Sequence, residues 1–367
     1  MRVSSRPVTV EAMTERTACQ SPNPQSLTDP GQLIANLPAI LGFFPRESIV
    51  LATFESVTGS TYSLGPILRL DIGTTEGVRD LFRGGGTIAD CDLVCAFVIS
   101  EEVLGGPHHS PRLLESLRLI EDAVADSTAT LAGIWGCEEV LTGSRYVSLR
   151  PAAGECAIPG WAGGTVSSVV GSAAMEQWVA AGKLPEVSRE DVFSRFTRGN
   201  PFLSASELAR IGERAGVGTQ RWSGGIGLVE ELGAMIADAE GLDEEVLLAD
   251  EELLDVCAAV LGETQLRDAA VGDVLGMPGA AGPVMLAAAK SLRGNARANA
   301  LCLYALAVIA EEFPMAANPA LITALAEVPR HSLSRLILHL LHTGDLDSLL
   351  ESVSRGSEVA RRGLAER

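Results

Sequence analysis

Lysine is nearly absent from this chain: Lys183 and Lys290 are the only two among 28 basic residues, against 47 acidic ones. The formal net charge of −19 repels a phosphate backbone. Affinity for nucleic acid depends on Lys and Arg side chains that neutralise phosphates. No basic stripe with interleaved aromatic residues occurs. We therefore expect no nucleic-acid partner.

The chain also lacks a long hydrophobic run. The longest nearly apolar run, residues 300–310, is about half of the roughly 20 residues that span a bilayer, so it predicts a buried helix. Residues 1–27 contain no apolar core of a secretory signal. The seven cysteines are odd in number and irregularly spaced, which is not typical of a disulfide framework. These absences indicate a reduced, cytoplasmic protein without a membrane partner.

Motifs that carry known chemistries are missing as well. The sequence has no Gly-x-Ser-x-Gly elbow, no His-Glu-x-x-His and no kinase signature set. The glycines at 84–86 follow a predicted helix and precede a predicted strand, the reverse of a phosphate-binding loop. No four-ligand set can be drawn from the cysteines and histidines. We predict no metal, no cofactor and no identifiable catalytic residue, and leave open whether the protein is an enzyme.

Aromatic residues are only 4 % of the chain, but apolar residues make up 47 % of its 367 residues, enough for two cores. Predicted strands at 48–54, 64–72, 92–99, 131–135, 139–141 and 146–149 alternate with predicted helices at 30–42, 75–82, from Pro111, and at 165–181. This alternation is typical of an α/β domain with a mixed sheet.

Strand patterns stop near residue 188. Helical periods separated by Gly-rich breakers follow, at 204–215, 226–240, 244–261, 283–292, 296–312, 319–327 and 332–342. The sequence thus predicts an α/β N-terminal half followed by an all-α helical C-terminal half. We expect a disordered tail at 1–27, the α/β domain at 28–187, the helical domain at 188–353 and a frayed charged tail at 354–367.

The loop at 100–110 is the first candidate site. It leaves the carboxyl end of a predicted central strand and carries Glu101, His108 and His109. Ligands of open α/β sheets gather at the carboxyl ends of strands, where imidazoles and carboxylates bind metals or move protons. The structural alternative is a solvated polar loop, since the spacing fits no named site.

A second group of candidates lies on neighbouring strands. Arg69 and Asp71 share the polar face of one predicted strand, and Arg46 precedes another. If strand 64–72 runs parallel to strand 92–99, Asp71 lies at the same end of the sheet as the 100–110 loop. Arg145 and Ser148 are further pocket candidates. The structural alternative for these residues is an ordinary ion pair.

Several motifs carry a resemblance. They are Asp29-Pro30, Leu37-Pro38, Leu41-Gly42-Phe43, Pro45-Arg46-Glu47-Ser48-Ile49-Val50, Arg69-Leu70-Asp71, Gly143-Ser144-Arg145-Tyr146-Val147-Ser148, Cys156, Pro159-Gly160, residues 295–307 and Pro329-Arg330-His331-Ser332-Leu333. Over residues 29–342 the chain resembles the actinobacterial domain-of-unknown-function 4192 family. The resemblance implies no activity. The family is often richer in cysteine after position 148, where this chain keeps only Cys156, and that departure weakens a metal site carried over from the family.

Two functional classes remain. The first is a non-catalytic interaction or regulatory protein, which binds a protein partner through a groove or acidic face of the helical half. Residues 222–266 contain twelve carboxylates and no Lys or Arg, a run that is usually a solvated face and less often meets a basic partner. The alternative is a small-molecule-binding protein or enzyme that uses the crevice at the strand ends.

Overall fold

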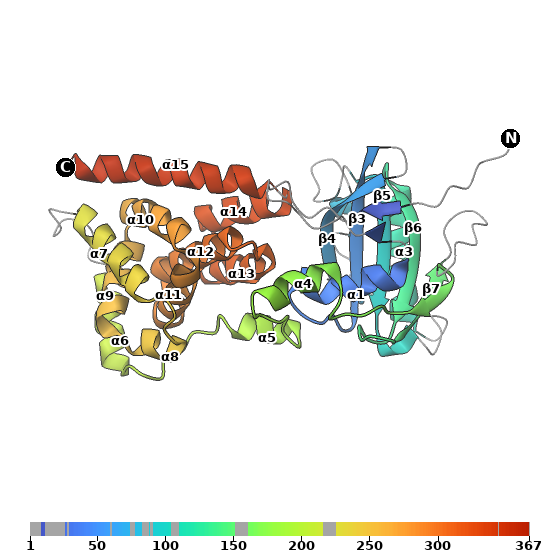
Figure 1. The fold of residues 1–367 in the computed structure, drawn as a ribbon, viewed down its shortest axis with the longest axis horizontal. Coiled ribbons are helices and arrows are strands. Elements are labelled where there is room, and N and C mark those ends of the chain that lie inside the picture. Colours follow the sequence, from blue (N-terminus) through green and yellow to red (C-terminus); the bar gives the residue numbers. More distant parts are fainter. Residues whose placement is uncertain are drawn as a thin grey trace. The chain divides into compact units, whose positions relative to one another are not determined.

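The computed structural model describes residues 9–11, 26–27, 29–58, 61–73, 78–82, 88, 91–103, 110–150, 161–215, 225–343 and 345–366. The chain divides into two compact units, Met1–Arg189 and Glu190–Arg367. The first unit contains the sheet and the second is helical, which confirms the predicted fold class (Figure 1). The sequence places the division after residue 187, and the structure places it after Arg189.

The α/β unit is built on one mixed sheet with the strand order β2-β1-β4-β3-β5-β6-β7-β8. Strand β3 is antiparallel to both of its neighbours, β4 and β5, whereas β5 and β6 are parallel. The strands are β1 (Thr9–Glu11), β2 (Ser26–Leu27), β3 (Ser48–Thr58), β4 (Thr61–Asp71), β5 (Leu93–Ile99), β6 (Thr130–Cys137), β7 (Arg145–Arg150) and β8 (Gly163–Thr165).

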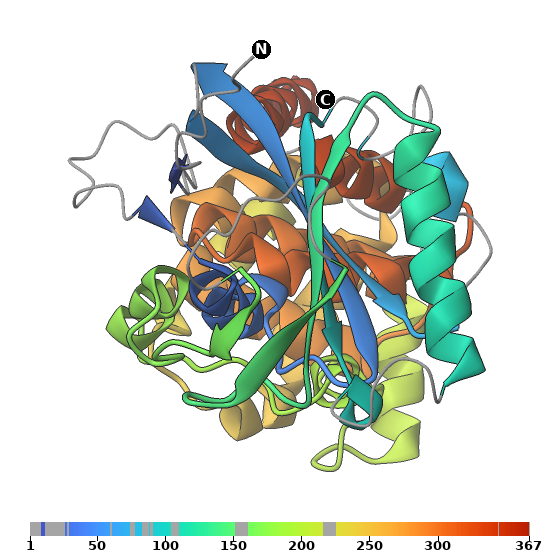
Figure 2. The same ribbon diagram turned by 90° about the vertical axis from the view of Figure 1, so that its right-hand side faces the viewer.

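Helices cover both faces of this sheet. Figure 2 shows α3 (Pro111–Ala125) on one side and α1 (Pro30–Leu41) with α4 (Ala173–Ala180) on the other. The short elements of this unit are α2 (Val78–Leu81) and the 3₁₀ helix η1 (Glu101–Val103). Because α3 connects the parallel strands β5 and β6, the predicted βαβ unit is confirmed.

Local sequence signals explain the bounds of α1. The Asp29 carboxylate accepts the N–H of Gln32 at 3.0 Å, and Pro30 occupies the first turn. Gly42 ends the helix with φ of 81°, a conformation that favours glycine. The predicted helix 30–42 is therefore confirmed.

The two faces of β5 build two layers of core. Val94, Ala96 and Val98 pack toward α3, against Leu113 and Leu117. On the opposite face, the rings of Phe97 and Trp135 stack with centroids 5.8 Å apart. The Trp135 indole donates to the carbonyl of Trp161 at 2.7 Å. Since alternate residues serve opposite faces, a buried strand of this kind is apolar throughout.

The helical unit surrounds one almost fully buried helix, α12. From Ala296 to Ile309, every residue of α12 is buried, which confirms the buried helix predicted at 300–310. The helices of this unit are α5 (Arg189–Ser194), which begins at the boundary, α6 (Ala205–Arg214), α7 (Gly225–Asp238), α8 (Glu244–Ala249), α9 (Glu251–Gly262), α10 (Thr264–Gly276), α11 (Pro278–Ser291), α12 (Gly294–Ala310), η4 (Pro314–Ala316), α13 (Ala317–Glu327), α14 (Ser332–Thr343) and α15 (Leu346–Ala365).

Some predicted elements are wrong. The helix expected at 165–181 is strand β8 followed by α4, and the segment 139–141 is not a strand. The helix expected at 244–261 breaks at Asp250, whose carboxylate instead caps α9 by accepting the N–H of Leu253. Strands β1 and β2 lie within the tail expected to be disordered at 1–27.

The frayed tail expected at 354–367 is also wrong, because α15 continues to Ala365. Ser357 is buried against α10, where its hydroxyl accepts the N–H of Gly272 and donates to the carbonyl of Ala269, both at 2.9 Å. The Arg361 guanidinium pairs with Asp273. Small residues let the two helices approach, and the charged residues reach across the contact.

Candidate functional site

The carboxyl ends of β4 and β5 lie at the same end of the sheet. Ser48 pairs with Asp71 of β4 and with Ile99 of β5, so β4 and β5 run in the same direction on either side of β3. The predicted orientation is therefore confirmed. Asp71 and Glu101 share this end, whereas His108 and His109 lie outside the described residues.

Glu47 connects the start of β3 to the end of β5. Its carboxylate accepts the hydroxyl of Ser100 at 3.2 Å and the N–H of Glu101, at the start of η1, at 3.4 Å. The Ser100 hydroxyl in turn accepts the N–H of Glu102 at 3.2 Å. Glu47 has φ of +42°, a left-handed conformation that is uncommon for a residue with a side chain. Such strained residues are enriched at binding and active sites.

Arg69 forms the cationic part of this end. Its Nε donates to the Ser48 hydroxyl at 2.8 Å, and its Nη1 pairs with the Asp71 carboxylate at 2.6 Å. The Ser48 hydroxyl donates to the carbonyl of Arg46, whose side chain is exposed. The Arg69 side chain is 14 % exposed and that of Asp71 is 61 % exposed. Within the described residues, Nη2 of Arg69 has no hydrogen-bond partner.

This arrangement offers both a cationic donor and anionic acceptors to a ligand. The free edge of the Arg69 guanidinium is a donor for a carboxylate or phosphate, and the exposed Asp71 oxygens are acceptors. Arg46, before β3, and Glu101, after β5, are exposed at the same end of the sheet. Across the part of the chain that the structure describes, no group of three or more His, Cys, Asp or Glu is placed to hold a metal ion.

Arg145 and Ser148 do not join these residues. Pairing across the sheet runs from Arg69 through Val50, Phe97 and Trp135 to Ser148, four strand spacings away. At about 4.8 Å per spacing, the separation is roughly 19 Å. Arg145, at the start of β7, is exposed on that same distant strand. Arg145 and Ser148 therefore lie on a different part of the sheet from Arg69 and Asp71.

The described thiols are poor nucleophiles. Cys91, Cys95, Cys137, Cys257 and Cys302 are all buried. Burial raises the pKa of Cys95, Cys137, Cys257 and Cys302 to about 12 each, so these four thiols stay protonated at neutral pH. They pack as small apolar side chains.

The helical unit presents a surface that motif searching misses. Leu242, two residues before α8, is 44 % exposed, and Val246, within α8, is 50 % exposed. Phe202 is exposed as well, and its N–H is held by Asn200, whose amide donates to the Leu248 carbonyl of α8 at 2.7 Å. We call Phe202, Leu242 and Val246, with the exposed acids Glu240, Asp243 and Glu245, the α8 surface. The only signal of it in the sequence is the carboxylate-rich run at 222–266.

Within the described residues, no helix is long and apolar enough to cross a bilayer. Neither a curated protein nor a solved structure matches the chain. A family model described as "Domain of unknown function (DUF4192)" matches residues 30–345, which covers parts of both units. This chain therefore belongs to the DUF4192 family.

Proposed function

We propose that the protein is a non-catalytic, cytoplasmic interaction protein whose α8 surface binds a basic, amphipathic segment of a partner protein. The observation that carries the proposal is the exposure of Leu242 and Val246 among carboxylates. Large exposed apolar side chains surrounded by charge are typical of the centre and rim of a protein interface.

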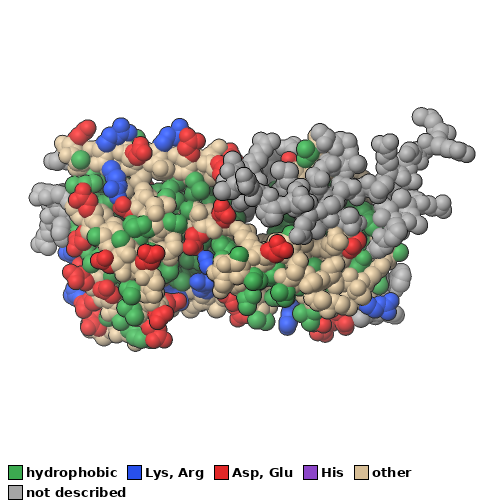
Figure 3. Space-filling view, viewed as in Figure 1, with side chains coloured by type: hydrophobic (Ala, Val, Ile, Leu, Met, Phe, Trp, Pro, Cys, Tyr) green, Lys and Arg blue, Asp and Glu red, His purple; other side chains and the backbone are tan. Residues whose placement is uncertain are grey.

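The charge balance of this surface indicates the chemistry of the partner. Glu244 is neutralised by Lys290 of α11, and Glu251 pairs with Arg210 of α6. Glu240, Asp243 and Glu245 are exposed, and no ion pair joins them to the rest of the described chain. The face of the helical unit seen in Figure 3 carries scattered acidic side chains, with hydrophobic and some basic side chains among them. A partner with Arg or Lys around an apolar stripe complements both features.

The test uses a defined probe, an amphipathic helical peptide of Leu, Ala and Arg, and a scrambled peptide of the same composition. Fluorescence anisotropy on the full chain should give tighter binding of the amphipathic peptide. Val246→Asp should weaken it about tenfold, although the substitution adds negative charge that attracts the peptide.

Val359→Asp is the matched control, because Val359 is an exposed valine on α15 in the same unit. It should leave the affinity unchanged. Equal affinities for the two peptides, or equal effects of the two substitutions, would show that the attraction is only electrostatic and would refute the proposed surface.

The second candidate function is the binding of a small anionic molecule at the end of the sheet. It is favoured by the strained Glu47 and by Nη2 of Arg69, which has no hydrogen-bond partner among the described residues. A thermal-shift screen of small carboxylates and phosphates should then stabilise the wild-type protein but not Arg69→Met. A ligand that stabilises both proteins equally would exclude this site.

A further inference from the structure

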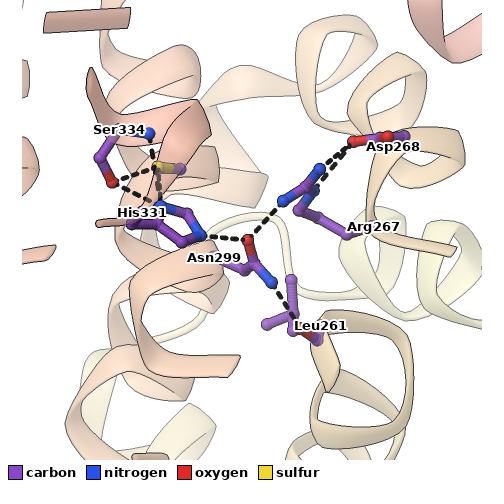
Figure 4. A network of polar contacts seen from close by, with 7 residues as sticks. Leu261, Arg267, Asp268, Asn299, His331 and Ser334 are labelled. Carbon is purple, nitrogen blue, oxygen red and sulfur yellow. Dashed lines mark hydrogen bonds and ion pairs between the residues drawn. The ribbon is translucent and has the colours of Figure 1, made fainter. Parts of the chain in front are cut away.

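A buried polar network lies between α9, α10, α12 and α14, and it is built around one amide (Figure 4). The Oδ1 atom of Asn299 accepts Nη1 of Arg267 at 2.7 Å and lies 3.0 Å from Nε2 of His331. The Nδ2 atom of Asn299 donates to the carbonyl of Leu261 at 2.8 Å. Because arginine can only donate, the orientation of the amide is fixed, and Nε2 of His331 must carry a proton.

The other ring nitrogen of His331 caps α14. This helix begins at Ser332, so His331 is its N-cap residue, and Nδ1 accepts the N–H of Ser334 at 3.3 Å. The Ser334 hydroxyl lies 2.7 Å from the same Nδ1 and 3.0 Å from Sγ of Cys302. With Nδ1 as acceptor, the thiol donates to the hydroxyl and the hydroxyl donates to the ring.

This proton arrangement requires a neutral imidazole. A proton on Nδ1 would turn the Ser334 hydroxyl around, so that it accepts from the ring and donates to Sγ of Cys302. The N–H of Ser334 would then face a second donor and lose the acceptor that caps α14. The proton would also place a second positive charge beside Arg267, since both cations would share the single oxygen of Asn299. His331, Ser334, Asn299 and Cys302 are all buried, so water cannot replace the lost hydrogen bonds.

The charged group that acts on the ring of His331 is the cation of Arg267. From α10, Arg267 contacts Asn299, and Asp268 accepts two of the remaining Arg267 N–H groups. From α12 the ring meets the thiol of Cys302, and from α14 the hydroxyl of Ser334. Burial first, and then the Arg267 charge, lower the pKa of His331 below its ordinary 6.5. Neither the thiol of Cys302 nor the hydroxyl of Ser334 carries a negative charge that would stabilise a protonated imidazole.

We infer that His331 is an acid-sensitive latch: protonation of its ring uncaps α14 and releases that helix from α12 and α10. This goes beyond the proposed function, because it concerns neither the α8 surface nor the end of the sheet. It assigns a conformational role to a histidine that packs as a core residue.

The direction of the pH dependence follows from the geometry. Above about pH 6.5 the ring is neutral in both the docked and the released state, and the contribution of the cap is complete. As the pH falls below 6.5, the released state binds a proton that the docked state excludes. The equilibrium constant for release therefore rises about tenfold per pH unit until the lowered pKa of the docked state is reached.

Hydrogen exchange on the full-length protein tests this inference. Protection of α14, corrected for the intrinsic rate of exchange, should fall between about pH 6.5 and pH 5.5, by up to about fivefold. His331→Asn keeps an N-cap acceptor that cannot be protonated, so the protection of α14 in this variant should not change between the two pH values. His339→Asn, on the exposed part of the same helix, should behave as the wild type. An unchanged wild type, or the same fall in His331→Asn, would overturn the latch.

A measurement on the wild-type protein covers the case in which His331→Asn does not fold. Imidazole nitrogen shifts from a histidine-labelled sample should give the Nε2–H tautomer for His331 at pH 7.5 or so, and a titration that coincides with the loss of α14 protection. The Nδ1–H tautomer, or a titration of the ring without a change in protection, would contradict the inference.

Discussion

Arg297 joins three parts of the helical unit, and its removal tests how that unit is held together. The side chain is 7 % exposed and all its donors point inward. Nε donates to the carbonyl of Ala289 in α11 at 2.9 Å, and Nη2 to the carbonyl of Phe196, beyond α5, at 2.6 Å. Nη1 pairs with the carboxylate of Glu327 in α13 at 2.7 Å. The perturbation is Arg297→Met, which keeps most of the side-chain volume.

The substitution leaves two buried carbonyls and one carboxylate without their partner. A buried acceptor that loses its donor costs about 1–3 kcal/mol, and breaking a buried ion pair costs about 3–5 kcal/mol. Glu327 keeps a 2.7 Å bond from the N–H of Gly294 and is partly exposed, so water compensates some of the loss. We expect a decrease of about 3 kcal/mol in the free energy of unfolding, a large fraction of typical domain stability.

Urea denaturation followed by far-ultraviolet circular dichroism measures this decrease, since helices give most of the signal. The matched control is Arg210→Met, which removes an ion pair between the exposed side chains of Arg210 and Glu251. Such a pair contributes at most about 1 kcal/mol. If the two variants lose the same stability, burial does not determine the value of these contacts and the reasoning fails.

Three further predictions concern the α/β unit and the thiols. Asp29→Ala should lower the free energy of unfolding by about 1 kcal/mol, because it removes the side chain that caps α1. Thermal denaturation measures this loss. The control is Asp126→Ala, which should be neutral because Asp126 is exposed and its side chain caps none of the described helices. Glu47→Ala should be about 1 kcal/mol less stable than Glu47→Gly in urea titration, because both lose the carboxylate but only alanine is strained at φ of +42°; equal values contradict the strain. The third prediction concerns five buried thiols, those of Cys91, Cys95, Cys137, Cys257 and Cys302. In native protein at pH 8 or so they should resist a thiol reagent that labels them at once in urea. Rapid labelling of any of them in the native protein would refute their burial.

Much of the α/β unit could be predicted because its signals are local. Asp29 with Pro30 and Gly42 mark both ends of α1, and alternating or continuous apolar runs mark β3, β4 and β5. The direction of β4 relative to β5 was an assumption, because the connection through α3 relates only β5 to β6. The structure confirms that assumption through β3, which lies between them.

Elements that depend on distant contacts could not be predicted. Helix α15 looks charged and terminal in the sequence, but it docks on α10 through Ser357 and Gly272. Helix α10 buries the charged Arg267 together with apolar residues, so its sequence has no clear amphipathic period to recognise. A hydroxyl or a glycine that makes a close helix contact has no distinctive local pattern.

The candidate sites show the same limit. The pair of Arg69 and Asp71 could be predicted because residues two apart in a strand point to the same face of the sheet. The partners of His331 are Asn299, 32 positions away, and Arg267, farther still along the chain. Only the folded helical unit brings them together, and a single sequence contains no sign of that contact.

The central claim, binding of a basic amphipathic segment at the α8 surface, is tested most directly by a hydrogen-exchange footprint. Full-length protein is compared with and without a saturating amphipathic Leu/Ala/Arg peptide. We expect exchange to slow in the segment from Leu242 to Ala249, and to remain unchanged in η1 and at the end of β4. Slower exchange at the end of the sheet, with no change around α8, would contradict the claim.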